Sequence, residues 1–216
     1  MSDTVLIPGG RDVRATLDTA ASAGRGSGDA GDAPRADAAV VACPPHPQQR
    51  GHRGDERLNA VSDALTDRGI DCLRFDYGDW DEGYGETTDA DNAVGWAAER
   101  YERVGLFGFS FGGTVALVTA ASRPGLAGVC ALAPTARLNP DVDAVAALDG
   151  LVDLGVATQV LYATRDSTAE WEPVVERAEE LGIETVAFES DHFFVGRAGD
   201  LGEAVSGFLG PRLRER

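Results

Sequence analysis

Five consecutive residues, Gly108 to Gly112, form the pattern G-x-S-x-G, which can expose a serine hydroxyl for nucleophilic attack. The apolar run Val104–Phe109 before the serine predicts a buried strand, and residues 113–118 after it predict a packed helix. A serine between a strand and a helix lies in a sharp turn, where side chains two residues before and after it would collide. We therefore expect Ser110 at a nucleophile elbow, with the first amides of the helix directed at a bound substrate oxygen.

A serine at an elbow needs a base to remove its proton, and the chain contains three histidines: His46, His52 and His192. In hydrolases with this elbow, the serine is followed first by the acid and then by the histidine. Only His192 follows Ser110, and it lies in the loop after a predicted strand, Glu184–Glu189. We expect His192 to be the base. The alternative is a surface histidine in a polar loop.

The base in turn needs a carboxylate that orients its ring, and this carboxylate should follow an earlier strand. The apolar, β-prone run Gln159–Thr164 is followed closely by Asp166, which we expect to be the acid. Asp191 competes because it is adjacent to His192, but a direct neighbour in sequence normally points away from its partner. Asp153 precedes the strand and is a weaker candidate.

The oxyanion of a tetrahedral intermediate needs two N–H donors. The first should be the backbone N–H of Phe111, the residue after the nucleophile, and the second should come from the loop after the strand Ala38–Cys43. That loop begins Pro44-Pro45-His46-Pro47, and proline has no N–H. His46 is therefore the expected second donor. The alternative is an ordinary stiff loop with a solvated His46 side chain.

Together these features resemble the small α/β-hydrolases without a lid, close to the dienelactone-hydrolase-like group. The resemblance rests on the loop at 44–47, a glycine-rich turn at 76–85, the elbow and the late His192-Phe193-Phe194. The first loop lacks the initial histidine of the His-Pro-His-Pro that is frequent in this group, and the turn lacks its arginine. The resemblance covers the chain from about residue 38 onward. It implies an α/β-hydrolase fold. The chemistry of a serine triad itself needs no dissociable cofactor.

The pattern of apolar runs predicts a single α/β-hydrolase domain over residues 1–216, with a mostly parallel, doubly wound sheet and an antiparallel N-terminal edge. The predicted strands are Thr4–Pro8, Val13–Leu17, Ala38–Cys43, Asp71–Asp76, Val104–Phe109, Gly128–Pro134, Thr158–Thr164 and Glu184–Glu189. The predicted helices between and after the later strands are Asp55–Arg68, Asp89–Arg103, Gly112–Arg123, Glu170–Leu181 and Leu201–Phe208.

Two connections carry further information. Residues 22–37 are rich in Gly, Asp and Ala without an apolar period, which predicts a flexible surface loop. Residues 135–157 lie where many hydrolases insert a lid, but they have room for only one helix, Val142–Leu151. We therefore expect no cap domain and a site open to solvent.

The net charge of −17 and the pI of about 4.4 argue against nucleic acid and anionic membranes as partners. All 19 basic residues are arginine, against 36 Asp and Glu. This balance predicts adaptation to concentrated salt, where acidic self-repulsion is screened. Drift in base composition is the alternative, although it does not by itself account for the acidic excess.

The three cysteines, Cys43, Cys72 and Cys130, fall in separate apolar runs. Their odd number and wide spacing match neither a disulfide framework nor a zinc motif, so we expect buried free thiols in a reducing cytoplasm. A metal site built on His46 and His52 would need further ligands, so we expect none. The sequence shows no signal peptide and no stretch of membrane-spanning length.

These residues predict a serine hydrolase that cleaves an ester or similarly activated acyl bond of a small molecule. The predicted triad is Ser110, Asp166 and His192, with oxyanion donors on Phe111 and His46. One alternative is a non-catalytic protein of the same fold that binds a ligand in the same cleft. Another is a peptidase or a C–C bond hydrolase with the same triad, since fold and triad do not determine the bond cleaved. The oligomeric state and the substrate's identity stay open.

Overall fold

The computed structural model describes residues 2–21 and 36–214. Most of the loop predicted at 22–37 therefore lies outside the described residues. Within them, the chain forms an eight-stranded sheet in the order β1-β2-β4-β3-β5-β6-β9-β10. The strands of this sheet are β1 Ser2–Ile7, β2 Val13–Asp18, β3 Ala38–Cys43, β4 Asp71–Phe75, β5 Arg103–Phe109, β6 Gly128–Leu132, β9 Thr158–Ala163 and β10 Glu184–Phe188.

The pairing of the strands confirms the predicted fold class. β2 runs antiparallel to both β1 and β4, and every other neighbouring pair in the large sheet is parallel. The carboxyl ends of the parallel strands meet at one edge of the sheet, which is where ligands bind in open α/β folds. The loops that carry the predicted site residues leave from this edge.

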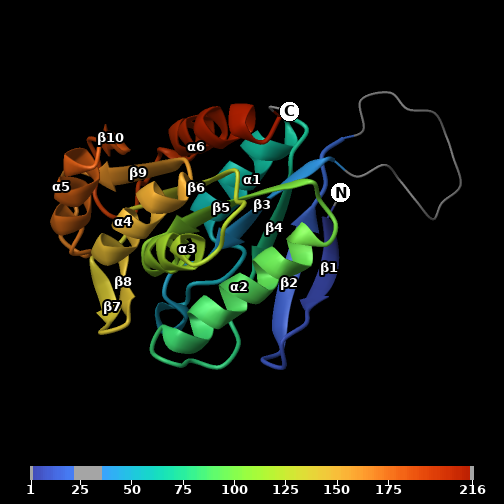
Figure 1. Ribbon diagram of the computed structural model, residues 1–216. Coiled ribbons are helices and arrows are strands. Elements are labelled where there is room, and N and C mark those ends of the chain that lie inside the picture. The colour runs from blue at the N-terminus through green and yellow to red at the C-terminus, as the bar shows by residue number, and fades with distance from the viewer. Residues whose placement is uncertain (1, 22–35, 215–216) are drawn as a thin grey trace, which may run out of the picture.

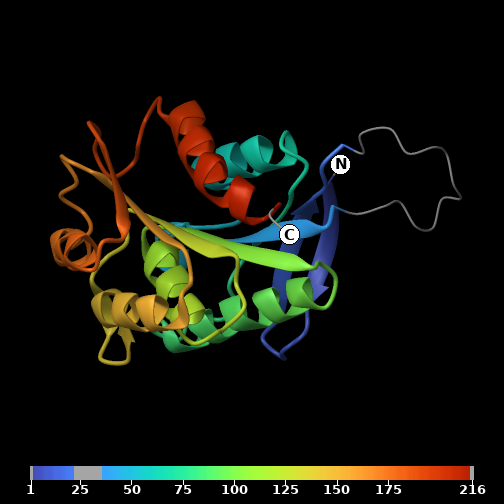
Figure 2. The same cartoon turned by 45° about the horizontal axis from the view of Figure 1, so that its top comes forward.

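Helices cover both faces of the sheet (Figures 1 and 2). On one face lie α1 (Glu56–Thr66) and α6 (Ala198–Arg212), which pack on each other. The other face is covered by α2 (Tyr84–Ala98), α3 (Phe111–Ala121), α4 (Ala144–Leu154) and α5 (Glu172–Glu180). The sheet is thus the middle layer of three, as predicted for a doubly wound fold.

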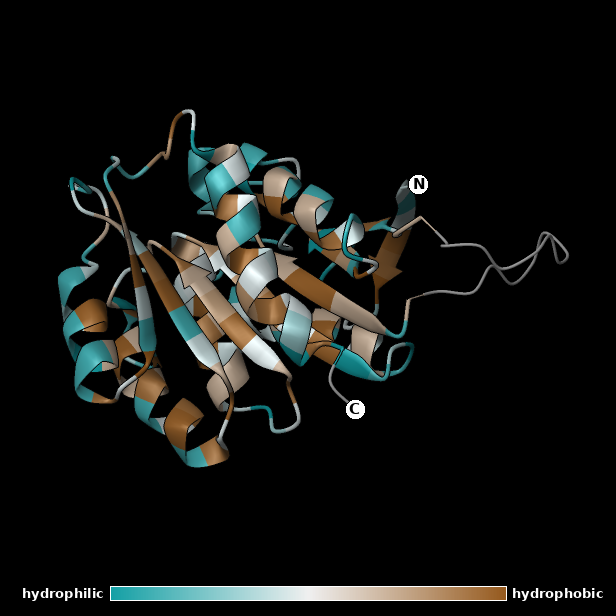
Figure 3. Ribbon diagram, turned by 90° about the horizontal axis from the view of Figure 1, so that it is seen from above, coloured by the Kyte–Doolittle hydropathy of each residue, from teal (hydrophilic) through white to brown (hydrophobic). Residues whose placement is uncertain are grey.

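The central strands are apolar on both faces because helices cover both. In β3, the side chains of Ala39, Val41 and Cys43 enter the core under α2 and α3, while Val40 and Ala42 enter the core under α1 and α6. Seen from above, the strands in the middle of the sheet are mostly tan and brown, the colours of hydrophobic residues (Figure 3). A buried parallel strand therefore appears in the sequence as an apolar run rather than as an alternation.

The segment at 135–157 holds no separate domain. It contains a small hairpin of β7 (Arg137–Asn139) and β8 (Val142–Asp143), followed by α4. The side chain of Asp143 accepts a hydrogen bond from the N–H of Ala146 and so caps α4. The predicted single helix is confirmed. The hairpin was not predicted. This short connection agrees with the expectation of a fold without a cap domain.

Helix α2 begins five residues earlier than the sequence predicts, at Tyr84 instead of Asp89. Gly83 precedes it with φ at 100°, a left-handed conformation that favours glycine. The carboxylate of Glu86 reaches back to accept the N–H of Gly83 at 2.8 Å, closing a capping interaction. The first turn is polar and shows no apolar period, so a reading based on periodicity misses it.

Candidate active site

Ser110 lies in a strained turn between β5 and α3. Its backbone has φ 57° and ψ −122°, and its N–H donates to the carbonyl oxygen of Leu132 at 2.8 Å. A Cβ atom on Gly108 would clash with the carbonyl of Gly112, and one on Gly112 would clash with the carbonyls of residues 43 and 44. Both flanking glycines are therefore required by close backbone contacts, as expected for an elbow.

The structure brings Ser110, His192 and Asp166 into one hydrogen-bonded chain. His192 Nε2 lies 2.9 Å from Ser110 Oγ, and His192 Nδ1 lies 2.6 Å from Asp166 Oδ2. The other carboxylate oxygen of Asp166 accepts the N–H groups of Thr168 at 2.8 Å and Ala169 at 3.1 Å. Because a carboxylate can only accept, the network assigns the ring proton to Nδ1 and leaves the Nε2 lone pair for the serine hydroxyl.

The other two acids considered for this position lie elsewhere. Asp191 directs Oδ1 to the backbone N–H of Phe193 at 3.0 Å. Asp153 is exposed on α4. The carboxylate of Asp166, by contrast, has no exposed surface, and the imidazole of His192 is 6% exposed. The pair is thus shielded from water, which strengthens the electrostatic interaction between them.

The loop that carries Asp166 is held from two sides. The N–H of Arg165 donates to the carbonyl of Ser190 at 3.0 Å, which joins the loop after β9 to the loop after β10. The indole N–H of Trp171 donates to the carbonyl of Asp166 at 3.2 Å, and its ring stacks on Tyr162 at 4.8 Å. Trp171 is a supporting residue that the sequence analysis missed, because its contact depends on how the loop folds back.

The loop after β3 lies directly beside the elbow. His46 precedes a short 3-10 turn, η1 (Pro47–Gln49), and its Nδ1 accepts the N–H of Gln48 at 3.2 Å. Its ring stacks on Trp80 at 4.7 Å and tilts against Phe111 at 4.9 Å. Burial lowers the pKa of His46, opposed by the nearby carboxylate of Glu86. This loop and the first turn of α3 therefore border the same space above Ser110.

The loop between β4 and α2 packs against the loop after β3 and against Phe111. Tyr77 donates to the carbonyl of Pro44 at 3.2 Å, and its ring meets Phe111 edge-on at 5.7 Å. Burial raises the pKa of the Tyr77 hydroxyl well above its usual value. Glu86 accepts the N–H groups of Asp81 at 2.9 Å and of Gly83 at 2.8 Å, which fixes the far end of the loop.

Two arginines near this loop are paired with carboxylates. Arg53 forms an ion pair with Asp76, and Arg57 forms one with Asp55 at 2.5 Å. Arg57 also donates to the carbonyl of Phe193 at 3.3 Å, and its guanidinium lies 4.6 Å from the centre of the Phe109 ring. It thereby ties α1 to the His192 loop, a contact that no sequence signal indicates.

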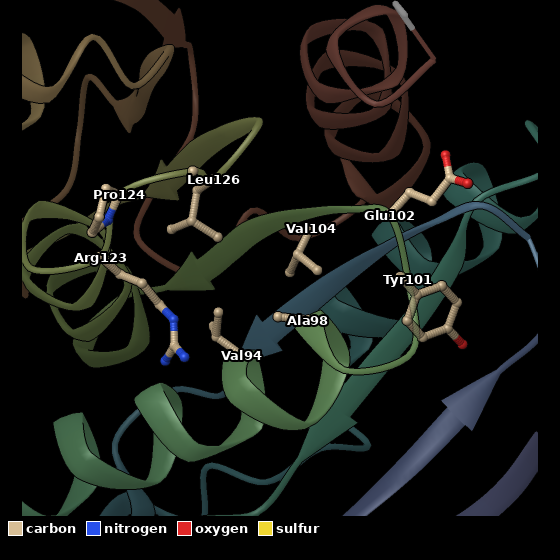
Figure 4. Close-up of a pocket in the computed structure, with 9 residues that line it drawn as sticks. Val94, Ala98, Tyr101, Glu102, Val104, Arg123, Pro124 and Leu126 are labelled. Carbon is tan, nitrogen blue, oxygen red and sulfur yellow. The ribbon is translucent and has the colours of Figure 1, made fainter.

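The described residues form two hollows. A small pocket of about 100 Å³ lies between α2 and the loop before β6 (Figure 4), at the amino end of β5. Because Ser110 follows the carboxyl end of this strand, the pocket is about 20 Å away. A wider, polar cleft of about 550 Å³ lies between the tip of the β1–β2 hairpin and residues 77–79 of the β4–α2 loop. The guanidinium of Arg11, which lines this cleft, forms an ion pair with the carboxylate of Asp89 at 2.8 Å and donates a hydrogen bond to the carbonyl of Asp79.

The three cysteines form no disulfide. Cys43, Cys72 and Cys130 are free and buried, and burial raises the pKa of the Cys72 thiol to about 12. Across residues 2–21 and 36–214, no three His, Cys, Asp or Glu side chains are grouped as metal ligands. Over the same residues, no helix has the length and apolar character needed to cross a membrane.

Comparisons with known proteins agree with the fold. The model of the X-Pro dipeptidyl-peptidase (S15) family matches residues 75–180. A serine hydrolase without a lid from Xanthomonas campestris is 19% identical, with 100% of this chain and 96% of that chain covered and a TM-score of 0.77. No curated protein matches the sequence.

Two further solved structures have the same fold. Dienelactone hydrolase from Anabaena variabilis is 19% identical, covers 99% of both chains and has a TM-score of 0.74. An esterase from Pyrococcus furiosus is 18% identical, with 99% of this chain and 92% of that chain covered and a TM-score of 0.72. The protein therefore has the α/β-hydrolase fold without a lid. The predicted resemblance to small lidless hydrolases, dienelactone hydrolase among them, is confirmed at the level of the fold.

Proposed function

We propose that the protein is a serine hydrolase that cleaves carboxylic esters, or similarly activated acyl bonds, of small molecules. The observation that carries this proposal is the hydrogen-bonded chain from Ser110 through His192 to Asp166, which ends on a strained serine at the start of a helix. A serine, a base within hydrogen-bond reach and a group that orients the base are the parts that acyl transfer requires.

In the first half of the reaction, His192 Nε2 accepts the proton of the Ser110 hydroxyl as its oxygen attacks the ester carbonyl. The carbonyl π electrons move to the oxygen and form a tetrahedral oxyanion. The backbone N–H groups of Phe111 and His46 are the proposed donors to this oxyanion. When the C–O bond to the alcohol breaks, His192 returns its proton to the leaving oxygen, and an acyl-enzyme remains on Ser110.

In the second half, His192 removes a proton from water, which attacks the acyl carbonyl. Collapse of the second tetrahedral intermediate releases the acid and returns the proton to Ser110. Asp166 stabilises the imidazolium that forms in both halves and holds the ring in the tautomer with the proton on Nδ1. It needs no rearrangement to do so, because two backbone N–H groups already fix its carboxylate.

The second candidate is peptide-bond cleavage, favoured by the match of residues 75–180 to the S15 peptidase family. That match includes Ser110 and Asp166 but ends before His192. The two activities separate on paired substrates: 4-nitrophenyl esters for the first, and X-Pro 4-nitroanilides for the second.

Exposed carboxylates on the β4–α2 loop (Asp79, Asp81 and Glu82) disfavour polyanionic substrates of either kind. For the compartment we propose a reducing cytoplasm, which fits the three free thiols.

The test uses a fluorophosphonate probe and 4-nitrophenyl butanoate. We expect the probe to label Ser110 and the ester to give a burst of 4-nitrophenol, because an acyl-enzyme accumulates. Ser110→Ala should abolish labelling and lower kcat by a factor on the order of 10⁴ or more. A protein that binds ligands without catalysis gives no burst, and unchanged turnover in Ser110→Ala would sink the proposed triad.

A further inference from the structure

Phe193 is a large apolar side chain that folding leaves in water next to the proposed base. It is 53% exposed, and its ring meets the His192 ring edge-on at 5.5 Å. The next residue, Phe194, is 2% exposed and packs against Phe109 and Phe188 in the core. The two phenylalanines therefore differ in role: one completes the core, and the other lies at the surface beside the imidazole.

Isolated exposed apolar residues are common, but those of this protein are not scattered. Seven large apolar side chains are exposed among the described residues. Four of them, Trp80, Tyr84, Phe193 and Val195, lie on or directly after the two loops that follow β4 and β10. Both loops leave the carboxyl edge of the sheet, where Ser110 and His192 lie. Four of the seven exposed large apolar side chains thus lie along the edge of the sheet that carries Ser110 and His192, and Phe193 is the one of these four whose ring contacts the imidazole.

The backbone around Phe193 is held on both sides. Its N–H donates to Asp191 Oδ1 at 3.0 Å, and its carbonyl accepts from Arg57 at 3.3 Å. The N–H of Phe194 donates to the carbonyl of Asp191 at 3.2 Å, and Phe194 has φ at 51°, in the left-handed region. The loop therefore presents the Phe193 ring from a fixed backbone, as a preformed subsite requires.

The proposed chemistry says what would contact this ring. His192 Nε2 has to protonate the leaving oxygen, which brings that oxygen to within about 2.6–3.2 Å of the nitrogen. The group attached to the leaving oxygen then lies against whatever flanks the imidazole. Phe193 is the exposed side chain whose ring contacts the imidazole. The guanidinium of Arg57, close by, is paired with Asp55 at 2.5 Å, so this surface favours a neutral group over an anion.

We infer that Phe193 forms the leaving-group subsite and determines specificity for esters whose alcohol carries an aromatic or bulky apolar group. The inference rests on the proposed function and adds the class of alcohol to it. The alcohol packs on the face of Phe193 during acylation and leaves before water attacks. Phe193 therefore discriminates between substrates in the first half of the reaction.

The experiment compares ethyl butanoate with 2-phenylethyl butanoate. Both alcohols are primary, and both esters yield the same acyl-enzyme, so the ratio of their kcat/KM values isolates the contact with the alcohol. For the wild type we expect a preference of about fivefold or more for the 2-phenylethyl ester, the size of one aromatic contact. Phe193→Ala should reduce this preference to less than about twofold. Phe193→Tyr should retain it, because the ring is kept.

Val195→Ser is the matched control. Val195 is 81% exposed in the same loop, and its replacement should leave the preference at the wild-type value. A second readout adds 2-phenylethanol to the reaction with 4-nitrophenyl butanoate. The alcohol intercepts the acyl-enzyme through the same subsite, so the ratio of transesterification to hydrolysis should fall in Phe193→Ala and not in Val195→Ser.

Three results overturn the inference. The first is an equal loss of kcat/KM on both esters, which would mean that Phe193 only positions His192. The second is a loss confined to deacylation, measured as the slow phase after the burst. The third is an unchanged preference in Phe193→Ala. In each of these cases burst and probe labelling persist, so the proposed function stands. Absence of turnover on every ester, together with absence of labelling, would overturn both proposals.

Discussion

The sharpest test of the site is the replacement of Asp166 by Asn, because the two side chains have the same shape. The carboxylate of Asp166 accepts three hydrogen bonds: His192 Nδ1–H at 2.6 Å on Oδ2, and the N–H groups of Thr168 and Ala169 on Oδ1. The two backbone donors face the same oxygen. In Asp166→Asn they hold the amide oxygen in that position, so the amide NH₂ faces His192.

This exchange reverses the tautomer of the base. An NH₂ group donates to Nδ1, which places the ring proton on Nε2, directed at the Ser110 hydroxyl 2.9 Å away. A protonated Nε2 cannot accept the serine proton, and the charge that stabilises the imidazolium is also lost. We expect kcat/KM to fall by a factor on the order of 10⁴, or about 5 kcal/mol in the barrier. Asp191→Asn is the control, because its amide oxygen can still accept from Phe193, and it should cost less than tenfold.

The assay is the initial rate of 4-nitrophenyl butanoate hydrolysis, with the rate of fluorophosphonate labelling as a second readout. Thermal melts of both variants show whether each folds like the wild type. The reasoning is refuted if Asp166→Asn keeps more than a tenth of the wild-type kcat/KM. It is also refuted if Asp191→Asn proves the costlier change.

Two further predictions concern stability. Because the net charge is −17, melting temperatures should rise as KCl increases from about 0.01 to 1 M and the Debye length falls from about 30 to 3 Å; a flat or falling midpoint would remove the prediction of salt adaptation. Burial tends to raise the pKa of Asp18, but hydrogen bonds from Arg74, Ser2 and Ser62 outweigh it and lower the pKa. A lowered pKa stabilises the folded state above the unfolded value of about 3.9 and ceases to do so as the pH falls through the folded value. Asp18→Asn should therefore cost about 2 kcal/mol in urea unfolding at pH 7, with a smaller difference from the wild type in acid; a constant difference would contradict this assignment.

The central sheet could be predicted because its signal is local. Each buried strand is a short apolar run between turn residues, and the structure confirms their positions to within one or two residues. Helix α6 shows where local signals fail. Its predicted span was Leu201–Phe208, but the helix covers Ala198–Arg212. Leu209 and Leu213 are fully buried in the core that α6 shares with α1. This packing stabilises the helix although its sequence contains glycines and Pro211, which have low helix propensity.

The three residues proposed as the triad could be predicted for a topological reason. Parallel strands bring their carboxyl ends to one edge, so the loops after β5, β9 and β10 meet although they are far apart in the sequence. The chain order of serine, acid and histidine then selected Ser110, Asp166 and His192 from many carboxylates. The hydrogen bonds among them are seen in the structure and do not follow from the sequence. That these three residues perform acyl transfer stays a prediction, which the experiments above test.

The contacts that hold these loops in place were beyond the sequence for the opposite reason. Arg57 and Phe193 are separated by 136 positions, and their hydrogen bond forms only because α1 packs beside the loop that leaves β10. Tyr77 and Pro44 are joined in the same way, across two neighbouring loops of the sheet edge. Neither contact follows a spacing rule or changes the local propensity of its segment. Reacting groups must be held to within a fraction of an ångström, and such contacts provide this precision. A sequence can therefore indicate which residues react before it indicates which residues hold them in place.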